Sequence, residues 1–173
     1  MLRKIVKYGD PVLEEVCDPV PESEFGTPEL RSLVDDMFET MYQARGVGLA
    51  APQVGIPKRL TVIDCSGGDG KGDQHVLINP EIVAEEGTQV AEEGCLSIPG
   101  FHEKVERPAT VRTRARTTDG EWIEFEASQL LARAICHETD HLNGVLFLNR
   151  LSRLKREIIK RKIRKLRKSG EWD

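Results

Sequence analysis

The sequence predicts an α+β fold in which antiparallel β-sheets pack around a central helix, with further helices in the N-terminal and C-terminal parts. Two kinds of spacing support this class. Apolar residues recur every three or four positions in three segments, as in amphipathic helices, and they alternate with polar residues in shorter segments, as in strands. The chain has 173 residues, of which 39% are hydrophobic, so it is long enough for one core but short for two. We expect a single domain over residues 1–173.

The first helix is expected over about residues 28–45. Thr27 is a typical N-cap residue, and Pro28 suits the first helical position. Apolar residues follow at helical spacing: Leu30, Leu33, Val34, Met37, Met41 and Ala44. The helix should stop at Gly46-Val47-Gly48, because glycines allow backbone angles and close approaches that a side chain forbids.

Strands are expected after this helix. One should cover residues 59–64 and another should lie near 75–78, with a glycine-rich turn at 66–72 between them. Alternation resumes at residues 111–116. Because the turn Thr118-Asp119-Gly120 and an aromatic-rich segment follow, we expect a β-hairpin there.

From about Ala127 the spacing becomes helical again, and Asn143-Gly144 provides a C-cap. The apolar stripe of this helix includes two histidines: Ala127, Leu130, Leu131, Ala134, His137 and His141. Both imidazoles should therefore face the core.

Charge is distributed unevenly along the chain. Residues 150–173, the basic tail, hold eleven Lys and Arg against three Asp and Glu, whereas residues 1–149 hold 14 against 26. We expect a basic helix over about residues 152–168, with these apolar positions: Leu154, Ile158, Ile159, Ile163 and Leu166. Two interpretations are open, namely a solvated face that packs its aliphatic side on the acidic body and a module that contacts nucleic-acid phosphates.

Neither the apolar runs nor the cysteines indicate a secreted or membrane protein. No run approaches the roughly 20 apolar residues of a membrane-spanning helix, and residues 1–10 lack the apolar centre of a secretory signal. The four cysteines have no paired spacing, so we expect reduced thiols in a cytosolic protein.

The most informative motif is His137-Glu138-Thr139-Asp140-His141. Positions i and i+4 of a helix share one face, so the two imidazoles can bind one metal ion beside a glutamate that can act as a general base. A catalytic metal needs a third protein ligand as well as an open position for water. The alternative is a helix that merely carries two histidines.

The third ligand must come from elsewhere in the chain. The extended metalloprotease motif would need histidine at position 147, where Phe147 stands, and the downstream carboxylates Glu157 and Glu171 are poorly placed. Cys95 is the better candidate, because residues 93–97 lie between Gly and Pro in what we expect to be a loop before the hairpin. A buried structural thiol is the alternative reading.

Three blocks occur in order: Gly46-Val47-Gly48-Leu49-Ala50-Ala51-Pro52-Gln53, Glu93-Gly94-Cys95-Leu96-Ser97 and His137-Glu138-Thr139-Asp140-His141. Their combination and rough spacing resemble the peptide deformylase family over most of the chain, the basic tail excluded. The resemblance implies an enzyme that hydrolyses the formyl group from the N-terminal formylmethionine of newly made proteins. The chain departs from the family at Cys136, where glutamine is usual, but one residue turns a helix by about 100°, so this thiol should point away from the metal.

The resemblance also implies a metal centre. Cys95, His137 and His141 would hold one divalent ion, which is usually Fe(II) in the cell and zinc or nickel in prepared samples. Metal-bound water would attack the formyl carbonyl while Glu138 acts as general base and then as general acid toward the departing amine.

Further roles follow from position in the family pattern. Gln53 and the backbone amide of Leu96 would be the oxyanion donors, and Gly46, Val47 and Gly48 would line the substrate cleft. The alternatives are an ordinary loop glutamine and glycines that merely form a turn.

Additional candidates surround this predicted site. Val47, Leu130 and Ala134 could form the pocket for the methionine side chain, although core packing explains them equally well. Glu93 and Asp140 could orient metal ligands, with a structural ion pair as the alternative.

The expected partners are formylated nascent polypeptides. The expected location is the bacterial cytosol, because residues 1–10 are too short for an organelle leader. The basic tail could bring the enzyme to ribosomal RNA. A zinc peptidase that cleaves internal peptide bonds is the rival enzyme class, and a nucleic-acid-binding module is the rival of another class.

Overall fold

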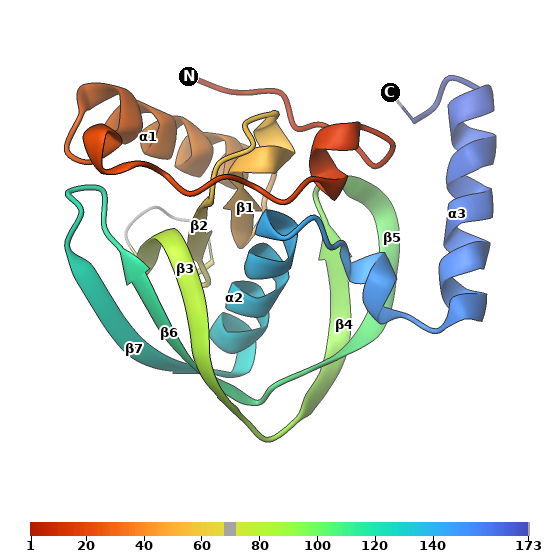
Figure 1. The fold of residues 1–173 in the computed structure, drawn as a ribbon. Coiled ribbons are helices and arrows are strands. Elements are labelled where there is room, and N and C mark those ends of the chain that lie inside the picture. The colour runs from red at the N-terminus through yellow and green to blue at the C-terminus, as the bar shows by residue number, and fades with distance from the viewer. Residues whose placement is uncertain (68–71, 173) are drawn as a thin grey trace.

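A computed structural model describes residues 1–67 and 72–172 of the chain. The glycine-rich turn expected at 66–72 falls partly outside these ranges. Two antiparallel sheets lie on either side of the central helix α2 (Gln129–Leu142), which confirms the predicted α+β class (Figure 1). Within the described ranges, none of the helices is both long and apolar enough to cross a membrane.

The larger sheet has five strands, and every neighbouring pair is antiparallel. In spatial order they are β1 (Gly48–Ala50), β2 (Leu60–Asp64), β3 (Gln74–Glu86), β6 (Thr110–Arg116) and β7 (Trp122–Ser128). The predicted hairpin is confirmed as β6 and β7. Strand β3 is much longer than predicted, because its second half is mostly exposed and carries no apolar pattern.

The smaller sheet pairs β4 (Gln89–Cys95) with β5 (Ile98–Arg107). The prediction of a loop at residues 93–97 is therefore wrong for residues 93–95, which belong to β4. Three of the seven residues of β4 are exposed, including Val90, and only one is buried, so the strand shows no alternation of buried and polar residues that the sequence could reveal.

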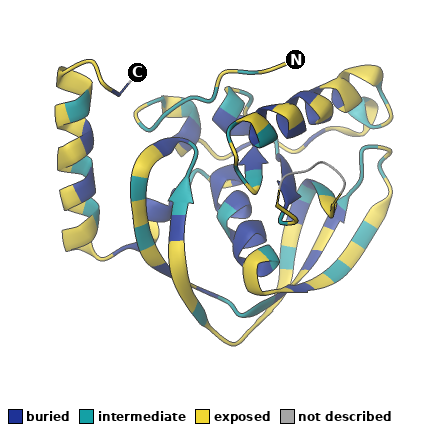
Figure 2. Ribbon diagram, turned by 180° about the vertical axis from the view of Figure 1, so that it is seen from behind, coloured by how far each residue is buried: buried dark blue, intermediate teal, exposed yellow. Residues whose placement is uncertain are grey.

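Helix α1 (Pro28–Gln43) begins as predicted, with the Thr27 hydroxyl accepting a hydrogen bond from the amide of Leu30, 3.3 Å away. Helix α2 begins two residues later than expected. Ala127 still belongs to β7, where it pairs with Val111, and is not part of the helical stripe. Figure 2 shows that α2 is buried along most of its length.

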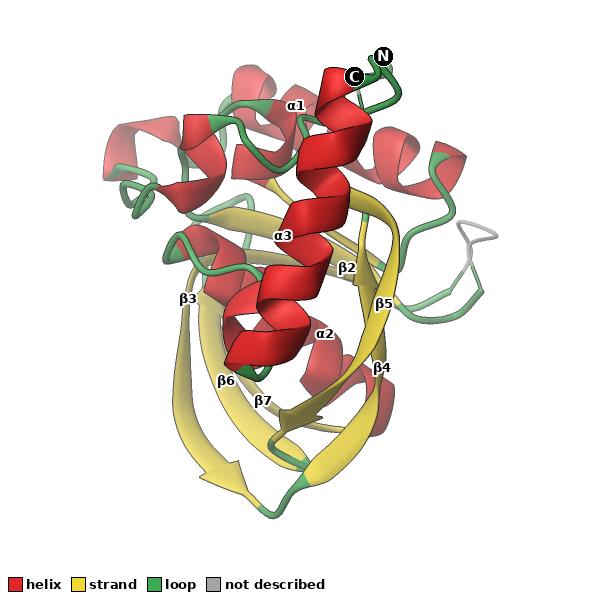
Figure 3. Ribbon diagram, turned by 90° about the vertical axis from the view of Figure 1, so that its right-hand side faces the viewer, coloured by secondary structure: helices red, strands yellow, loops and turns green. Residues whose placement is uncertain are grey.

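Helix α3 (Arg153–Lys168) lies at the edge of the molecule and crosses in front of β5 in Figure 3. Ile159 and Ile163 are buried, but Leu154 is 72% and Ile158 45% exposed. The predicted apolar stripe is thus only half covered by the body. Beyond α3, the indole of Trp172 donates a hydrogen bond to the carbonyl of Tyr8.

Gly144, just after α2, offers a test of the packing around this helix. Its φ is +74°, and a Cβ there would lie 2.6 Å from the carbonyl oxygen of Glu14; Gly26 has nearly the same φ of +76° but no atom within 4 Å of its Cβ position. Both alanine variants carry backbone strain of about 1 kcal/mol. We expect G144A to lower the free energy of unfolding by about 1–3 kcal/mol more than G26A, because the backbone of Glu14 cannot rotate away. Denaturant unfolding measures both values, and equal losses would contradict the predicted clash.

Candidate functional site

Three potential metal ligands converge from two elements. Helix α2 presents His137 and His141 one turn apart, with their Nε2 atoms 3.2 Å from each other. Strand β4 brings the Cys95 sulfur to 3.3 Å from Nε2 of His141, and the three donor atoms all lie within 4.8 Å of one another. The structure thus brings together the predicted cysteine and both predicted histidines.

The spacing of these donors suits one cation. Two nitrogens bound at 2.0–2.1 Å with a tetrahedral angle between them lie about 3.3 Å apart, close to the separation of the two imidazoles. Burial lowers the pKa of His141 well below its usual value, and the charge of His137 adds to this effect, so His141 is the neutral imidazole that a metal requires. For His137 burial also opposes the charge, but contacts with Cys95 and Glu93 outweigh it and raise the pKa.

Glu93 orients the first imidazole. Its Oε1 lies 3.0 Å from Nδ1 of His137, so a neutral ring that donates from Nδ1 presents Nε2 to the site. Arg107 donates two hydrogen bonds of 2.9 Å to the same carboxylate. Burial alone would raise the pKa of Glu93, yet the hydrogen bonds from Arg107 and His137 hold it at about 2. Glu93 is therefore a carboxylate in contact with a predicted metal ligand.

Asp140, the other residue expected to orient a ligand, has different partners. It accepts hydrogen bonds from Arg107 at 2.7 Å and from Arg150 at 2.7 and 3.1 Å. Among the described hydrogen bonds, Asp140 reaches the imidazoles through Arg107 and Glu93, which agrees better with the ion-pair reading.

Glu138 lies against strand β1 and is only 3% exposed. Its Oε1 is 3.7 Å from Nε2 of His137, and Oε2 has no hydrogen-bond partner among the described residues. A Cβ on Gly48 would lie 3.0 Å from Cγ of Glu138, so glycine lets the strand pass directly over this side chain. Burial raises the pKa of Glu138 to about 7, although the charge of His137 opposes the shift. The group can thus gain or lose a proton near neutral pH.

Gln53 is held at both ends of its amide. In the short helix η3 (Ala51–Val54), its Oε1 accepts a hydrogen bond from the amide of Ala50 at 3.0 Å, and its Nε2 donates to the hydroxyl of Ser97 at 3.1 Å. The same Nε2 lies 3.6 Å from the sulfur of Cys95. These contacts fix a neutral N–H donor beside the predicted metal centre.

A cavity of about 420 Å³ opens onto these groups. Its walls include all the residues predicted for the cleft, the oxyanion donors and the methionine pocket: Gly46, Val47, Gly48, Gln53, Leu96, Leu130 and Ala134. A Cβ on Gly46 would lie 2.7 Å from Cδ1 of Leu96, so these two segments meet closely at the wall.

Cys136 lies outside this arrangement, as expected. It packs in the hydrophobic cluster that contains Ile63 and Leu77, and burial raises the pKa of its thiol to about 11. At neutral pH it is an inert neutral thiol.

The sequence did not single out three residues that support the site. Ser97 anchors Gln53, while Arg107 and Arg133 both donate to Glu93. For Arg133 a signal was present, because it lies four residues before His137 and shares its helical face. No local pattern marks Arg107, since its partners lie on β4 and α2.

These features define a class of protein: a metal-dependent hydrolase with one cysteine sulfur and two imidazoles available as ligands and a buried carboxyl group next to them. Comparison with known proteins narrows this class. The model of the polypeptide deformylase family matches residues 2–157. The chain belongs to this family of metal-dependent enzymes, which remove formyl groups from nascent peptides.

The relatives match along nearly the whole chain. A peptide deformylase of Acidobacterium capsulatum is 56% identical over 172 residues, which are 99% of each chain. One of Hydrogenovibrio crunogenus is 54% identical over 152 residues, 88% of this chain and 87% of its own. The crystal structure of a peptide deformylase from Legionella pneumophila has a TM-score of 0.90 and 43% identity, and the match covers 100% of this chain and 99% of the other. The similarity therefore includes the basic tail, which the three motifs left out.

The convergence of donors predicts a metal centre that depends on one particular thiol. We expect the protein to bind one equivalent of Co²⁺ with near-ultraviolet absorption from charge transfer between thiolate and cobalt. C95A should lose this absorption, whereas C65A, whose thiol lies outside the donor cluster, should keep it. Titration with Co²⁺ followed by absorption spectroscopy measures both, and full intensity in C95A would exclude Cys95 as a ligand.

Proposed function

We propose that this chain removes the formyl group from the N-terminal formylmethionine of newly synthesised proteins, with Glu138 as the general base and then the general acid. The observation that carries the proposal is the placement of Glu138. A carboxyl group with a pKa near 7 lies beside one of three convergent metal ligands, within the cavity that would receive the substrate. A general acid–base group is most effective when its pKa lies near the working pH.

Cys95, His137 and His141 would hold the metal. A bound divalent ion would supply a Lewis acid that polarises the formyl oxygen and lowers the pKa of water. We infer Fe²⁺ as the ion in the cell, and Zn²⁺ or Ni²⁺ as ions that the same donors accept in purified protein, because thiolate and imidazole ligands suit all three.

Glu138 would move the proton between the reactants. Its unpartnered Oε2 can accept a proton from the attacking water, and the protonated carboxyl can then donate to the departing amine of methionine. The close approach of Gly48 limits the space on one side of the carboxyl group, which favours this fixed position over a swing into solvent.

Gln53 and the backbone amide of Leu96 would stabilise the negative charge that develops on the formyl oxygen. Gln53 suits this role because Ala50 and Ser97 hold its amide, while its Nε2 also lies 3.6 Å from the Cys95 sulfur and so has an N–H directed toward the predicted metal centre. Removal of one such donor typically raises the barrier by about 2.7–4 kcal/mol.

The peptide would bind as an added strand. Strand β1 is an edge of the five-stranded sheet, β4 belongs to the separate two-stranded sheet, and residues of both strands line the cavity. Val47 and Leu130 are 41% and 48% exposed in this region. Together with Ala134 they offer an apolar surface for the methionine side chain.

The central experiment is release of formate from formyl-Met-Ala-Ser, compared with cleavage of the unformylated peptide. We expect only the first reaction; cleavage of the second alone would favour the rival zinc peptidase.

E138A should keep its metal and lose at least about 100-fold in kcat, because general acid–base catalysis contributes 10²–10⁴-fold. E126A, which alters an exposed glutamate of β7, is the matched control and should retain full activity. Full activity of E138A would rule out its role as the base.

We also propose that residues 1–173 form one domain. In addition, we propose that the basic tail contacts the ribosome in the bacterial cytoplasm. Helix α3 buries only part of its apolar side and leaves basic residues together with Leu154 and Ile158 exposed. A phosphate backbone is the complementary partner for this surface. The bacterial origin of the curated relatives supports the location.

The triple variant R161E/K162E/K165E tests this contact without removing the buried residues of α3. We expect it to lose cosedimentation with ribosomes at low salt while its formate release from a tripeptide is unchanged, since these side chains are exposed and distant from the cavity lining. Unchanged cosedimentation would leave the basic tail as a solvated face.

A further inference from the structure

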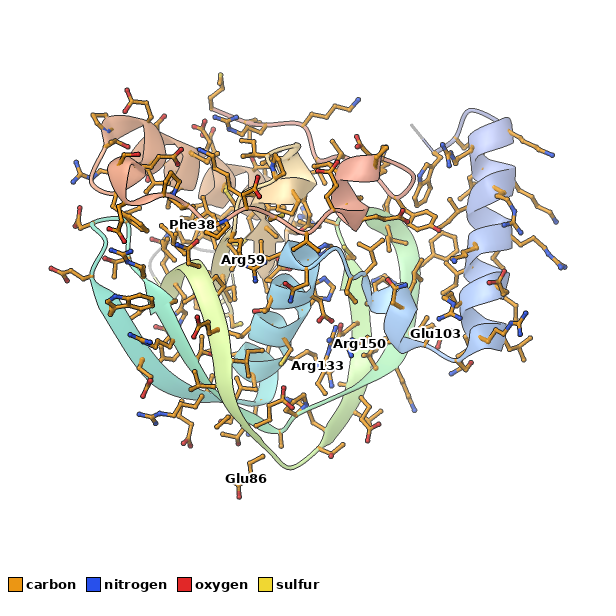
Figure 4. All side chains as sticks on the ribbon, in the orientation of Figure 1. Phe38, Arg59, Glu86, Glu103, Arg133 and Arg150 are labelled. Carbon is orange, nitrogen blue, oxygen red and sulfur yellow. The ribbon has the colours of Figure 1, made fainter. Side chains whose placement is uncertain are left out.

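We propose that Arg133 is a positioning residue of the metal centre, which fixes Glu93 and strand β4 against α2 and so sets the separation of Cys95 from the two histidines. This inference rests on the proposed metal-dependent function. Figure 4 labels Arg133, which lies between α2 and β4. The side chain comes from α2, one turn before His137, and the residue is 5% exposed.

The carboxylate of Glu93 has its acceptor positions filled. Oε1 accepts hydrogen bonds from Nη2 of Arg107 and from Nδ1 of His137. Oε2 accepts hydrogen bonds from Nε of Arg107 and from Nη1 of Arg133. A carboxylate has about four lone-pair positions, so these four donors occupy all of them. Rotation of the carboxyl group would break at least one contact to a charged donor.

Arg133 joins three elements through one nitrogen. Its Nη1 donates to Glu93 on β4 and also to the carbonyl of Val105 on β5, at 3.0 Å. Its Nη2 is buried and has no hydrogen-bond partner among the described residues. Burial of an unpartnered N–H is unfavourable, so the contacts of Nη1, and not burial itself, account for a guanidinium at this position.

The contact bears directly on the predicted metal ligands. Glu93 and Cys95 are two residues apart at the end of β4, where Oε1 of Glu93 lies 3.0 Å from Nδ1 of His137 and the sulfur of Cys95 lies 3.3 Å from Nε2 of His141. His137 and His141 follow Arg133 along α2, one and two turns later. The Arg133–Glu93 pair therefore fixes β4, which carries Cys95, to α2, which carries both imidazoles. The contact lies one helical turn before His137.

The test uses Co²⁺ as the probe in the full-length protein. We expect R133M, which keeps the aliphatic stem, to release Co²⁺ to a chelator about 10-fold faster than wild type, with a shifted cobalt absorption spectrum, because loss of a partner that orients a ligand typically costs 10–100-fold in metal affinity. R133K retains the positive charge and hydrogen-bond donors and should restore part of the retention of Co²⁺. Circular dichroism and thermal unfolding establish that each variant is folded; if R133M fails to fold, R133K against wild type decides.

R150M is the matched control. Arg150 contacts Asp140 in the same charged cluster but does not contact Glu93 among the described hydrogen bonds, so R150M removes the same charge without the contact. We expect its cobalt spectrum and release rate to match wild type. Equal behaviour of R133M and wild type, or an equal change in R150M, would overturn the inference. Failure of wild-type protein to bind Co²⁺ through Cys95 would instead overturn the proposed metal centre itself.

Discussion

The charge of Glu93 is the constraint on which the proposed metal centre depends. The carboxylate is buried, and donors from β5 and α2 surround it, namely Arg107, Arg133 and His137. With a pKa of about 2 it stays ionised wherever the protein functions. One carboxylate thereby orients an imidazole, pairs with two guanidinium groups and joins the two elements that supply the donor atoms.

A buried cluster of this kind specifies geometry more than it adds stability. Desolvation of each ion opposes the gain from pairing, whereas removal of one partner leaves an uncompensated charge in a medium of low dielectric. Asp140 accepts a hydrogen bond from Nη1 of Arg107, and Arg150 pairs with Asp140 and extends the cluster toward solvent. The pairing contributes chiefly by restricting these side chains to a single arrangement.

The sequence could predict the helices and the donor set but not the environment that joins them. Helix α1 was predicted within two residues because its core face repeats with the helical period. The same reasoning failed for β4 and β5, which expose much of their surface, and so Cys95 was found through its motif while its strand was missed. Contacts such as those of Glu93 with Arg107, or of Gly48 with Glu138, join distant segments and leave no local periodic signal.

The position of the cavity beside the edges of two separate sheets has a consequence for the breadth of recognition. Under the proposed function, a peptide that lay there would be held through amides and carbonyls, which every polypeptide carries, and only the first side chain would enter the apolar surface. Such binding would be selective for the first residue of a chain and almost indifferent to the side chains after it. One enzyme could then serve a whole proteome, because its discrimination would be concentrated on a single terminal residue.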